Sequence, residues 1–321
     1  MSIYAIPAAA VVTIVIAYIL TRIISTNFQK FGIVGADVHK LDRPIRAEMG
    51  GVAVLVSVPI GAGVMLFLDP STTWLFVAGL VTIVLVGLVG VLDDFFGIRQ
   101  RYKPFMVAAA GIPLAYALLG RTSISFPVVG SISFGLLYPV FIVPLAIATS
   151  ANFSNMLAGF NGLEAGYAVI AIGTLSGLAG IGGNWNASLL GLLFIAAYLG
   201  FLKLNWYPAK VFPGDTGTLM SGAAIATLGL MSRLEFAAIV LSMPAAIDFT
   251  LKMLSRNPFS SRKLFGDSKV TPAGTLQPAS YAALSHAFMR TSPTSERGLV
   301  LSLLGLEALY AVIAIVVTLW I

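Results

Sequence analysis

Apolar segments of helix length alternate with short polar segments along the whole chain. Crossing about 30 Å of hydrocarbon takes roughly 20 helical residues, and a helix satisfies its own backbone polar groups in lipid. Ten segments approach or reach this length: 3–24, 51–68, 74–92, 104–119, 135–152, 165–181, 187–204, 216–231, 236–254 and 299–321. The pattern predicts an all-α, polytopic membrane protein with about ten transmembrane helices, formed by one domain over residues 1–321.

The composition supports this fold class. Hydrophobic residues make up 58% of the 321 residues, charged residues only 10%, and the mean hydropathy is +0.94. Water-soluble domains are far less apolar. The first segment lacks a basic leading region and a convincing cleavage site, so we expect a retained helix and not a signal peptide. Because the chain has no cysteine, disulfide and thiol chemistry are excluded.

Charged residues are distributed unevenly between alternate loops. Seventeen of the 19 lysine and arginine residues fall on one side of the ten segments, and only Arg121 and Arg233 fall on the other. Short cytoplasmic loops are rich in these residues, so both termini are predicted to lie outside the cytoplasm. Nine of the 13 acidic residues join the basic side, whereas Asp248 and Glu307 lie within apparent spans. The basic pI indicates contacts with anionic lipid or a phosphate substrate, and no nucleic acid is expected.

The loops carry three further predictions. The alternating Ser-Ile-Ser-Phe pattern within 120–134 predicts a small hairpin. Within the longest loop, 255–298, the stretch 279–289 is predicted to form an amphipathic helix at the membrane interface. The active-site cleft is expected to be formed by the cytoplasmic loops, at about 25–50, 93–103, 153–164, 205–215 and 255–298.

Two adjacent acids end the third segment. They are Asp93 and Asp94, and Lys103 follows ten positions after the first of them. An ionised acid in the bilayer centre costs roughly 2.5–3.5 kcal/mol on insertion scales, so the pair needs a polar cleft, an interface or a nearby cation. One interpretation is a Mg²⁺ or phosphate site in which Lys103 supplies a positive charge. The alternative is a solvated helix end with local ion pairs.

Asparagines and glycines dominate the loop between the fifth and sixth segments. Asn152 and Asn155 are three positions apart, so on a helix they share a face and offer two amide oxygens in one direction. Amide oxygens are suitable ligands for Mg²⁺. Asn161 follows among glycines that permit a tight turn or close approach of the backbone to a ligand. The alternative for the three asparagines is a turn with helix capping.

Asp215 stands immediately before the eighth segment. This position predicts the N-cap of that helix, where a carboxylate accepts backbone N–H groups, and capping is compatible with metal binding. Phe212, three residues earlier, is a candidate for stacking on a base or for anchoring in the membrane interface.

Together these loops resemble the polyprenyl-phosphate N-acetylhexosamine-1-phosphate transferases, glycosyltransferase family 4. The resemblance covers essentially the whole chain and is strongest to the dolichyl-phosphate GlcNAc-1-phosphate transferases and their archaeal relatives. The stretches that carry it are Asn155-Met-Leu-Ala-Gly-Phe-Asn161-Gly-Leu-Glu164, Asn205-Trp-Tyr-Pro208 and Phe212-Pro-Gly-Asp215-Thr216. Bacterial members typically carry acids where this chain has Ala158 and Asn161, and a histidine-containing signature in the first cytoplasmic loop, which this chain lacks. A role in peptidoglycan synthesis is therefore disfavoured.

The resemblance implies a role for individual residues. Asn155 and Asp215 would bind Mg²⁺, with Mn²⁺ as a substitute, and Lys103 would contact the lipid phosphate beside Asp93 and Asp94. The residues expected to bind substrate are Val38 through its backbone, Glu48, Asn152, Asn161, Phe212, Arg262 and Lys263. Neither His39 nor His286 has a sequence partner that would make it catalytic.

The implied reaction transfers a sugar-1-phosphate from a UDP-sugar, in the first place UDP-GlcNAc, to polyprenyl or dolichyl phosphate and releases UMP. It would be the first membrane step in assembling a lipid-linked glycan. A transferase of the same fold with another UDP-sugar and a secondary transporter are the alternatives. We expect a cell-membrane protein whose site faces the cytoplasm; the oligomeric state is open, and a homodimer is one alternative.

Overall fold

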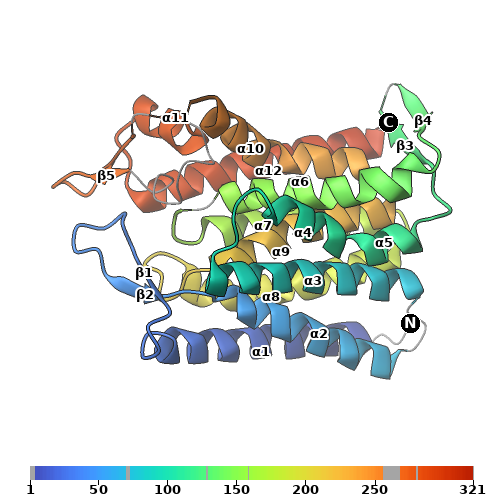
Figure 1. The fold of residues 1–321 in the computed structure, drawn as a ribbon, viewed down its shortest axis with the longest axis horizontal. Coiled ribbons are helices and arrows are strands. Elements are labelled where there is room, and N and C mark those ends of the chain that lie inside the picture. The colour runs from blue at the N-terminus through green and yellow to red at the C-terminus, as the bar shows by residue number, and fades with distance from the viewer. Residues whose placement is uncertain are drawn as a thin grey trace.

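The computed structural model is a helical bundle in which the long helices lie roughly parallel or antiparallel to one another (Figure 1). It describes residues 4–69, 73–127, 129–157, 159–255, 268–279 and 281–320. The long helices are α1 (Ala5–Asn27), α2 (Gly51–Leu68), α3 (Trp74–Phe96), α6 (Val143–Met156), α7 (Leu163–Ile181), α8 (Trp185–Asn205), α9 (Gly214–Ser232), α10 (Glu235–Ser255) and α12 (Glu296–Trp320). The shorter ones are α4 (Lys103–Ala110), α5 (Ile112–Ala117), the π-helix η1 (Tyr138–Ile142) and α11 (Leu284–Thr291).

Three short hairpins complete the described structure. Strand β1 (Val34–Ala36) pairs with β2 (Ile45–Ala47), β3 (Ser123–Phe126) with β4 (Gly130–Ser133), and β5 (Lys269–Val270) with β6 (Leu276–Gln277), all antiparallel. The β3/β4 pair confirms the hairpin predicted within 120–134. A helix also forms within the stretch predicted to be helical, but as α11 it begins at Leu284 and ends at Thr291.

All ten apolar segments coincide with helices, and eight described helices are long and apolar enough to cross a membrane. The fourth segment, 104–119, differs from a single span because it divides into α4 and α5 at Gly111. Pro113 lacks the N–H that would continue the hydrogen-bond ladder across this point. The fifth segment likewise begins with η1, which contains Pro139, before it continues as α6.

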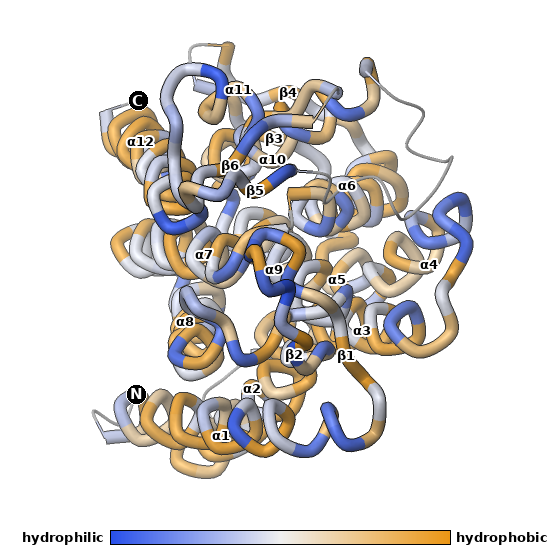
Figure 2. The backbone as a smooth tube through the Cα atoms, turned by 90° about the vertical axis from the view of Figure 1, so that its left-hand side faces the viewer, coloured by the Kyte–Doolittle hydropathy of each residue, from blue (hydrophilic) through white to orange (hydrophobic). Residues whose placement is uncertain are grey.

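Helix α9 lies in the middle of the bundle (Figure 2). All its residues from Thr216 to Ser232 are buried, and many are glycine, alanine, serine or threonine. Small residues let membrane helices approach closely. At Gly222, a Cβ atom would lie 2.1 Å from the carbonyl oxygen of Ser150 on α6, and the Ser150 hydroxyl donates to the Gly222 carbonyl at 2.8 Å. The small side chains of α9 therefore bring its neighbours, and the polar groups they carry, close together.

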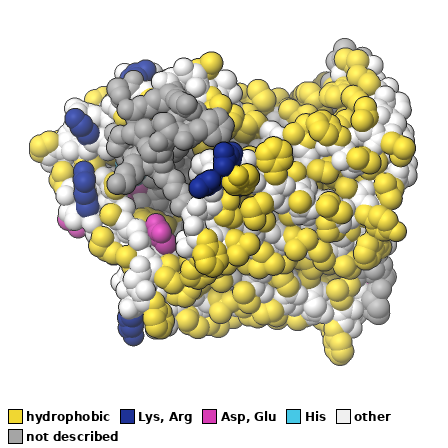
Figure 3. Space-filling view, viewed as in Figure 1, with side chains coloured by type: hydrophobic (Ala, Val, Ile, Leu, Met, Phe, Trp, Pro, Cys, Tyr) yellow, Lys and Arg dark blue, Asp and Glu magenta, His cyan; other side chains and the backbone are white. Residues whose placement is uncertain are grey.

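The two ends of the bundle differ in character. Helix α1 begins and α12 ends at the end of the bundle that carries β3 and β4, whereas β1, β2, β5 and α11 lie at the other (Figure 1). On the face drawn in Figure 3, apolar side chains cover most of the bundle and the visible charged side chains gather at the end with β1 and α11. The polar loops thus assemble at one end, as the loop pattern predicts.

Asp248, for which the sequence offers no role, joins three helices at this polar end. Its Oδ2 forms an ion pair with Lys252 Nζ at 2.6 Å, and its Oδ1 accepts the N–H of Leu284, the first residue of α11, at 2.7 Å. Lys252 Nζ also donates to the carbonyl of Met156 at the end of α6, at 2.6 Å. This buried acid thereby fixes α6 and α11 against α10.

Candidate active site

A buried lysine lies at the centre of the predicted acid, amide and lysine set. Lys103, the first residue of α4, places its Nζ 2.7 Å from Asp93 Oδ2, 3.1 Å from Asp215 Oδ2 and 3.1 Å from Asn155 Oδ1. The side chains of Lys103 and Asp93 are 1% and 0% exposed, whereas that of Asp215 is 27% exposed. Helices α3, α4, α6 and α9 thus bring four of the predicted site residues together from three separate stretches of the sequence.

The amide of Asn155 completes this cluster. Its Nδ2 donates to Asp215 Oδ1 at 2.6 Å and to Thr218 Oγ1 at 2.7 Å, so both ends of the amide have partners. Thr218 lies three residues after Asp215, one turn along α9, and that spacing is the signal by which it could have been found from the sequence.

Asp94, and not Asp215, caps helix α9. The prediction for Asp215 is wrong because the helix begins at Gly214, which places Asp215 inside the first turn. The Asp94 carboxylate, from α3, accepts the N–H groups of Asp215 at 2.7 Å and Thr216 at 3.0 Å, and the Thr216 hydroxyl at 2.7 Å. The positive end of the α9 dipole favours a carboxylate at this place. The two adjacent acids therefore have different roles. Asp93 forms an ion pair with Lys103, and Asp94 caps the first turn of α9.

The donor set of the cluster fits a divalent cation. Asp215 Oδ2 and Asn155 Oδ1 each lie 3.1 Å from Lys103 Nζ, so the two predicted metal ligands lie close together around this ammonium. Carboxylate and amide oxygens are the hard ligands that Mg²⁺ takes. Asp93, Asp94 and Asp215 set three carboxylates against the one ammonium of Lys103, which leaves two negative charges when all are ionised.

The same residues form one wall of a cavity of about 420 Å³. Its described lining comprises Ala36, Asp37, Val38, His39, Glu48, Asp93, Asp94, Asn155, Gly159, Phe160, Asn161, Glu164, Asn205, Phe212, Pro213, Gly214, Asp215 and Thr218. The structure thus brings Val38, Glu48, Asn161 and Phe212 to the same cavity as the acids. Lys103 is not in this lining and lies behind its three partners.

Asn161 is held on every side by the protein. Its Oδ1 accepts the N–H of Ala209 at 2.6 Å, and its Nδ2 donates to Asp37 Oδ2 at 3.2 Å and to Glu296 Oε1. Glu296 Oε1 also accepts the Asn161 N–H at 2.8 Å. The ammonium of Lys40 pairs with Asp37 and lies 3.0 Å from Glu296 Oε2. This network joins the loop after β1 to the start of α12, and Glu296 has no signal in the sequence that predicts it.

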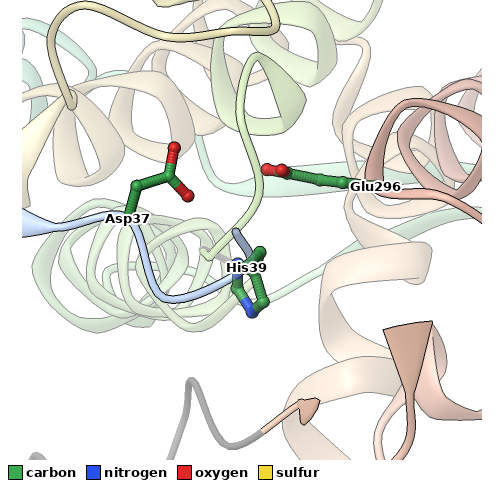
Figure 4. Close-up of side chains that lie close together, drawn as sticks. All are labelled: Asp37, His39 and Glu296. Carbon is green, nitrogen blue, oxygen red and sulfur yellow. The ribbon is translucent and has the colours of Figure 1, made fainter. Parts of the chain in front are cut away.

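Asp37, His39 and Glu296 place one ligand atom each within 4.8 Å of one another (Figure 4). The two carboxylates point toward each other and the His39 ring lies to one side. The Lys40 ammonium pairs with both carboxylates, and Asn161 donates to both. Both carboxylates thus already have an ammonium and an amide as partners, and we assign the group to structure and not to metal binding.

Three predicted substrate-binding residues are not placed at the cavity. Asn152 lies on α6 with Asn155, but its Nδ2 donates to the Ala148 carbonyl of the same helix at 2.7 Å, and it is not among the lining residues. Arg262 and Lys263 lie outside the described residues.

Asn205 lines the cavity although it was not among the predicted substrate-binding residues and contributed only to the family resemblance. Its Nδ2 donates to the Val211 carbonyl at 2.9 Å.

A second, mostly apolar cavity of about 200 Å³ lies between α6, α9 and α10. Its lining runs from Phe153, two residues before Asn155, to Ile124 of β3 and Glu235 at the start of α10. Aliphatic side chains provide most of the surface, with a few hydroxyl groups such as Ser242. Such a space suits a hydrocarbon chain.

Comparison with known proteins agrees with this arrangement. Residues 76–233 match the family described as glycosyl transferase family 4. A putative UDP-N-acetylglucosamine--dolichyl-phosphate N-acetylglucosaminephosphotransferase of Saccharolobus solfataricus is 34% identical, and the match covers 98% of each chain. The chain therefore belongs to glycosyl transferase family 4.

More distant relatives come from eukaryotes and bacteria. The UDP-N-acetylglucosamine--dolichyl-phosphate N-acetylglucosaminephosphotransferase of Schizosaccharomyces pombe is 31% identical over 56% of this chain and 44% of that protein. A phospho-N-acetylmuramoyl-pentapeptide-transferase of Bacillus licheniformis is 31% identical over 60% of this chain and 63% of that protein. The family resemblance drawn from the loop motifs is confirmed.

Proposed function

We propose that this protein transfers a sugar-1-phosphate, GlcNAc-1-phosphate in the first place, from a UDP-sugar to a dolichyl-type polyprenyl phosphate and releases UMP. The observation that carries the proposal is the cluster of Asp93, Asn155 and Asp215 around the Lys103 ammonium, at the wall of a cavity large enough for a nucleotide. The names of relatives that match nearly the whole chain support the two substrates.

In this reaction a phosphate oxygen of the lipid forms a bond to the β-phosphorus of the donor. The bond between that phosphorus and the oxygen bridging to the α-phosphorus breaks, and its electron pair leaves with UMP. Two anions must meet, so charge neutralisation and positioning dominate the barrier. The attacking phosphate is already largely ionised near neutral pH, because its second pKa is about 6, so no strong base is required.

The chain's own groups fit these demands. Lys103 offsets part of the negative charge of Asp93 and Asp215 from behind the cavity wall, which lowers the repulsion that an entering phosphate would meet. To contact the lipid phosphate, the Lys103 ammonium would have to give up one or more of its contacts with Asp93, Asn155 and Asp215. Asp94 fixes the first turn of α9 and hence the position of Asp215. Mg²⁺, or Mn²⁺ in its place, would be held by Asp215 and Asn155 and would supply further charge neutralisation for the phosphates.

The arrangement of the bundle supports a cytoplasmic site. Helix α1 begins and α12 ends at the end opposite β1, which is the arrangement expected of ten spans with both termini outside the cytoplasm (Figure 1). The site would then lie at the cytoplasmic ends of the helices, where a UDP-sugar arrives and a lipid phosphate sits at the interface. The apolar cavity beside Phe153 is positioned to receive the first part of the polyprenyl chain. A transporter would be expected to carry its polar site near the middle of the bilayer.

A donor panel tests the proposal. Purified protein with Mg²⁺, polyprenyl phosphate and one UDP-sugar at a time should form a lipid-linked sugar, read by mass spectrometry, with UDP-GlcNAc giving the most product. If another UDP-sugar gave the most product, the assignment of the donor would change and the assignment of the reaction type would stand. No lipid-linked product from any UDP-sugar, in protein that remains folded, would refute the transferase assignment.

A further inference from the structure

Asn155 stands at the end of its helix. It is the second-last residue of α6, which ends at Met156. The ends of helices fray, so the backbone alone holds a side chain there less firmly than in the middle of a helix. A cation ligand at this place therefore needs support from outside α6.

Helix α9 supplies this support with two side chains one turn apart. Asp215 and Thr218 are three residues apart and so share a face of the helix. Asn155 Nδ2 donates to Asp215 Oδ1 at 2.6 Å and to Thr218 Oγ1 at 2.7 Å. An amide nitrogen carries two hydrogens, and this one has two acceptors. The amide oxygen then faces Lys103, whose Nζ lies 3.1 Å away.

The Thr218 hydroxyl has a defined direction. Its Oγ1 donates to the carbonyl of Gly214, one turn earlier on α9, at 3.2 Å. A hydroxyl has a single hydrogen, so with that hydrogen directed at the helix backbone it presents a lone pair to the Asn155 amide. Thr218 is 2% exposed and lines the cavity together with Asn155 and Asp215. It is therefore well placed to act as an acceptor at the site.

The packing of α6 against α9 sets the separation between Thr218 and Asn155. One turn beyond Thr218, the close approach of Gly222 to the Ser150 carbonyl joins the two helices, and the Ser150 hydroxyl donates to the Gly222 carbonyl. The Thr218 contact with Asn155 thus continues a row of contacts between α6 and α9. It does not depend on the loop that follows α6.

The two acceptors of the amide differ in charge. Asp215 is shared, because its carboxylate also pairs with Lys103 and is a predicted ligand of the cation. A cation bound there withdraws charge from the carboxylate and weakens its hydrogen bond with Asn155. The Thr218 hydroxyl is neutral, so its contact persists whether the cation is bound or absent. Groups that contact a metal ligand in this way fix its orientation.

We propose that Thr218 is a positioning residue that holds the Asn155 amide with its oxygen toward the cation site, through the hydrogen bond that Thr218 Oγ1 accepts. This inference rests on the proposed function, since it takes Asn155 to be a ligand of Mg²⁺. Each of the two ligands then has its own support. Asp94 fixes the turn that carries Asp215, and Thr218 fixes Asn155.

The test removes and restores the hydroxyl. Thr218→Val deletes it and keeps a side chain of similar shape, whereas Thr218→Ser retains it. Thr218→Ala also deletes it and takes the place of the valine variant if that variant does not fold. Thr227→Val is the matched control, because Thr227 lies on the same helix, is 0% exposed and is outside the described cavity lining. Its Oγ1 has no hydrogen-bond partner in the described part of the chain.

Mn²⁺ is the probe of the cation site, and its binding to purified protein without substrates is followed by the loss of the free-ion signal in electron paramagnetic resonance. Losing a group that orients a metal ligand weakens metal binding about 10–100-fold. For Thr218→Val we expect a Kd for Mn²⁺ at least about tenfold higher, and a similar rise in the Mg²⁺ concentration that gives half-maximal UMP release.

At saturating Mg²⁺ the Thr218→Val enzyme should resemble the wild type, because the orientation of the amide is then restored by the bound ion. We expect kcat and the KM values for UDP-GlcNAc and polyprenyl phosphate to stay within about threefold. Thr218→Ser should recover at least half of the lost Mn²⁺ affinity on a logarithmic scale. Thr227→Val should bind Mn²⁺ like the wild type.

The outcomes separate this inference from the proposed function. Unchanged Mn²⁺ affinity in Thr218→Val, in an active wild-type background, would overturn the inference alone. An equal loss in Thr227→Val, or no recovery in Thr218→Ser, would also overturn it, because the effect would then come from packing. A higher substrate KM at saturating Mg²⁺ would do the same, because Thr218 would then act on a substrate.

The wild-type protein provides the remaining distinction. Turnover without Mn²⁺ binding would overturn the inference and leave the transfer reaction standing. A folded wild-type protein with neither Mn²⁺ binding nor turnover would refute both. Thermal unfolding of each variant shows that the comparison is made on folded protein.

Discussion

Replacing Lys103 by methionine removes the one described cation that the cluster shares. Methionine has a similar length and volume, so the change deletes the charge and leaves the packing nearly intact. Asp93 would lose its partner 2.7 Å away with its side chain 0% exposed, and Asp215 would lose a partner 3.1 Å away. Breaking a buried ion pair from one side costs about 3–5 kcal/mol. Asp215 is 27% exposed, so solvent screens its share and most of the cost comes from Asp93.

The double variant Asp93→Asn, Lys103→Met separates stability from activity. With the acid neutralised, the uncompensated buried charge disappears, and the free energy of unfolding should recover by most of the amount lost in Lys103→Met. Activity should not recover, because the charge that offsets the incoming phosphates is still absent. We expect UMP release to fall by at least about 100-fold in both variants.

Thermal unfolding in detergent, followed by tryptophan fluorescence, and UMP release at saturating substrates measure the two effects. Asp93→Asn alone is the control for the amide. Two results would contradict these roles of Lys103: a Lys103→Met protein that is as stable as the wild type, or a double variant with near-normal turnover. The first result would mean that the ion pair contributes nothing to the fold, and the second that Lys103 contributes nothing to the reaction.

Three further predictions follow from single contacts. Asp94→Ala should lower the free energy of unfolding by about 1–2 kcal/mol, because α9 loses its capping carboxylate, and chemical denaturation compared with Asp94→Asn checks this. Asn152→Ala should keep UMP release within about twofold of the wild type, because the side chain bonds to its own helix; a loss of more than about tenfold would place it at the substrate after all. Because burial lowers the folded-state pKa of His39 to about 4, below the unfolded value of 6.5, the unfolded chain binds the proton first as the pH falls. Stability should therefore decrease between about pH 6.5 and 4, and the decrease attributable to His39 should be absent in His39→Phe; identical pH profiles would contradict the assignment.

Most of the long apolar helices could be predicted because lipid leaves a chain few choices. Runs such as 51–68 must be helical to satisfy their backbone, and the observed α2 has the same bounds. The cluster of Asp93, Lys103, Asn155 and Asp215 could be anticipated for a related reason: charged and amide groups beside apolar runs need one another. The division of 104–119 at Gly111 was missed, although Pro113 carries the signal for it.

Long-range pairing between loops could not be predicted. Asp94 holds the start of α9, more than a hundred residues away, and Glu296 holds Asn161 across an even longer separation. Nothing local in either stretch specifies its partner, since any loop acid at the same end of the bundle could serve. For Asn152, the helical spacing from Asn155 indicates a shared face, but it does not specify that the side-chain amide donates to the Ala148 carbonyl of its own helix.

The central claim is that a sugar-1-phosphate, and not a sugar alone, moves to the lipid. UDP-GlcNAc radiolabelled at the β-phosphorus, incubated with the purified protein, Mg²⁺ and polyprenyl phosphate, tests it most directly. If the protein transfers the sugar-1-phosphate, the label enters the lipid product and unlabelled UMP appears in equal amount. Label retained in released UDP, with a sugar on the lipid, would contradict it, as would the absence of any labelled lipid.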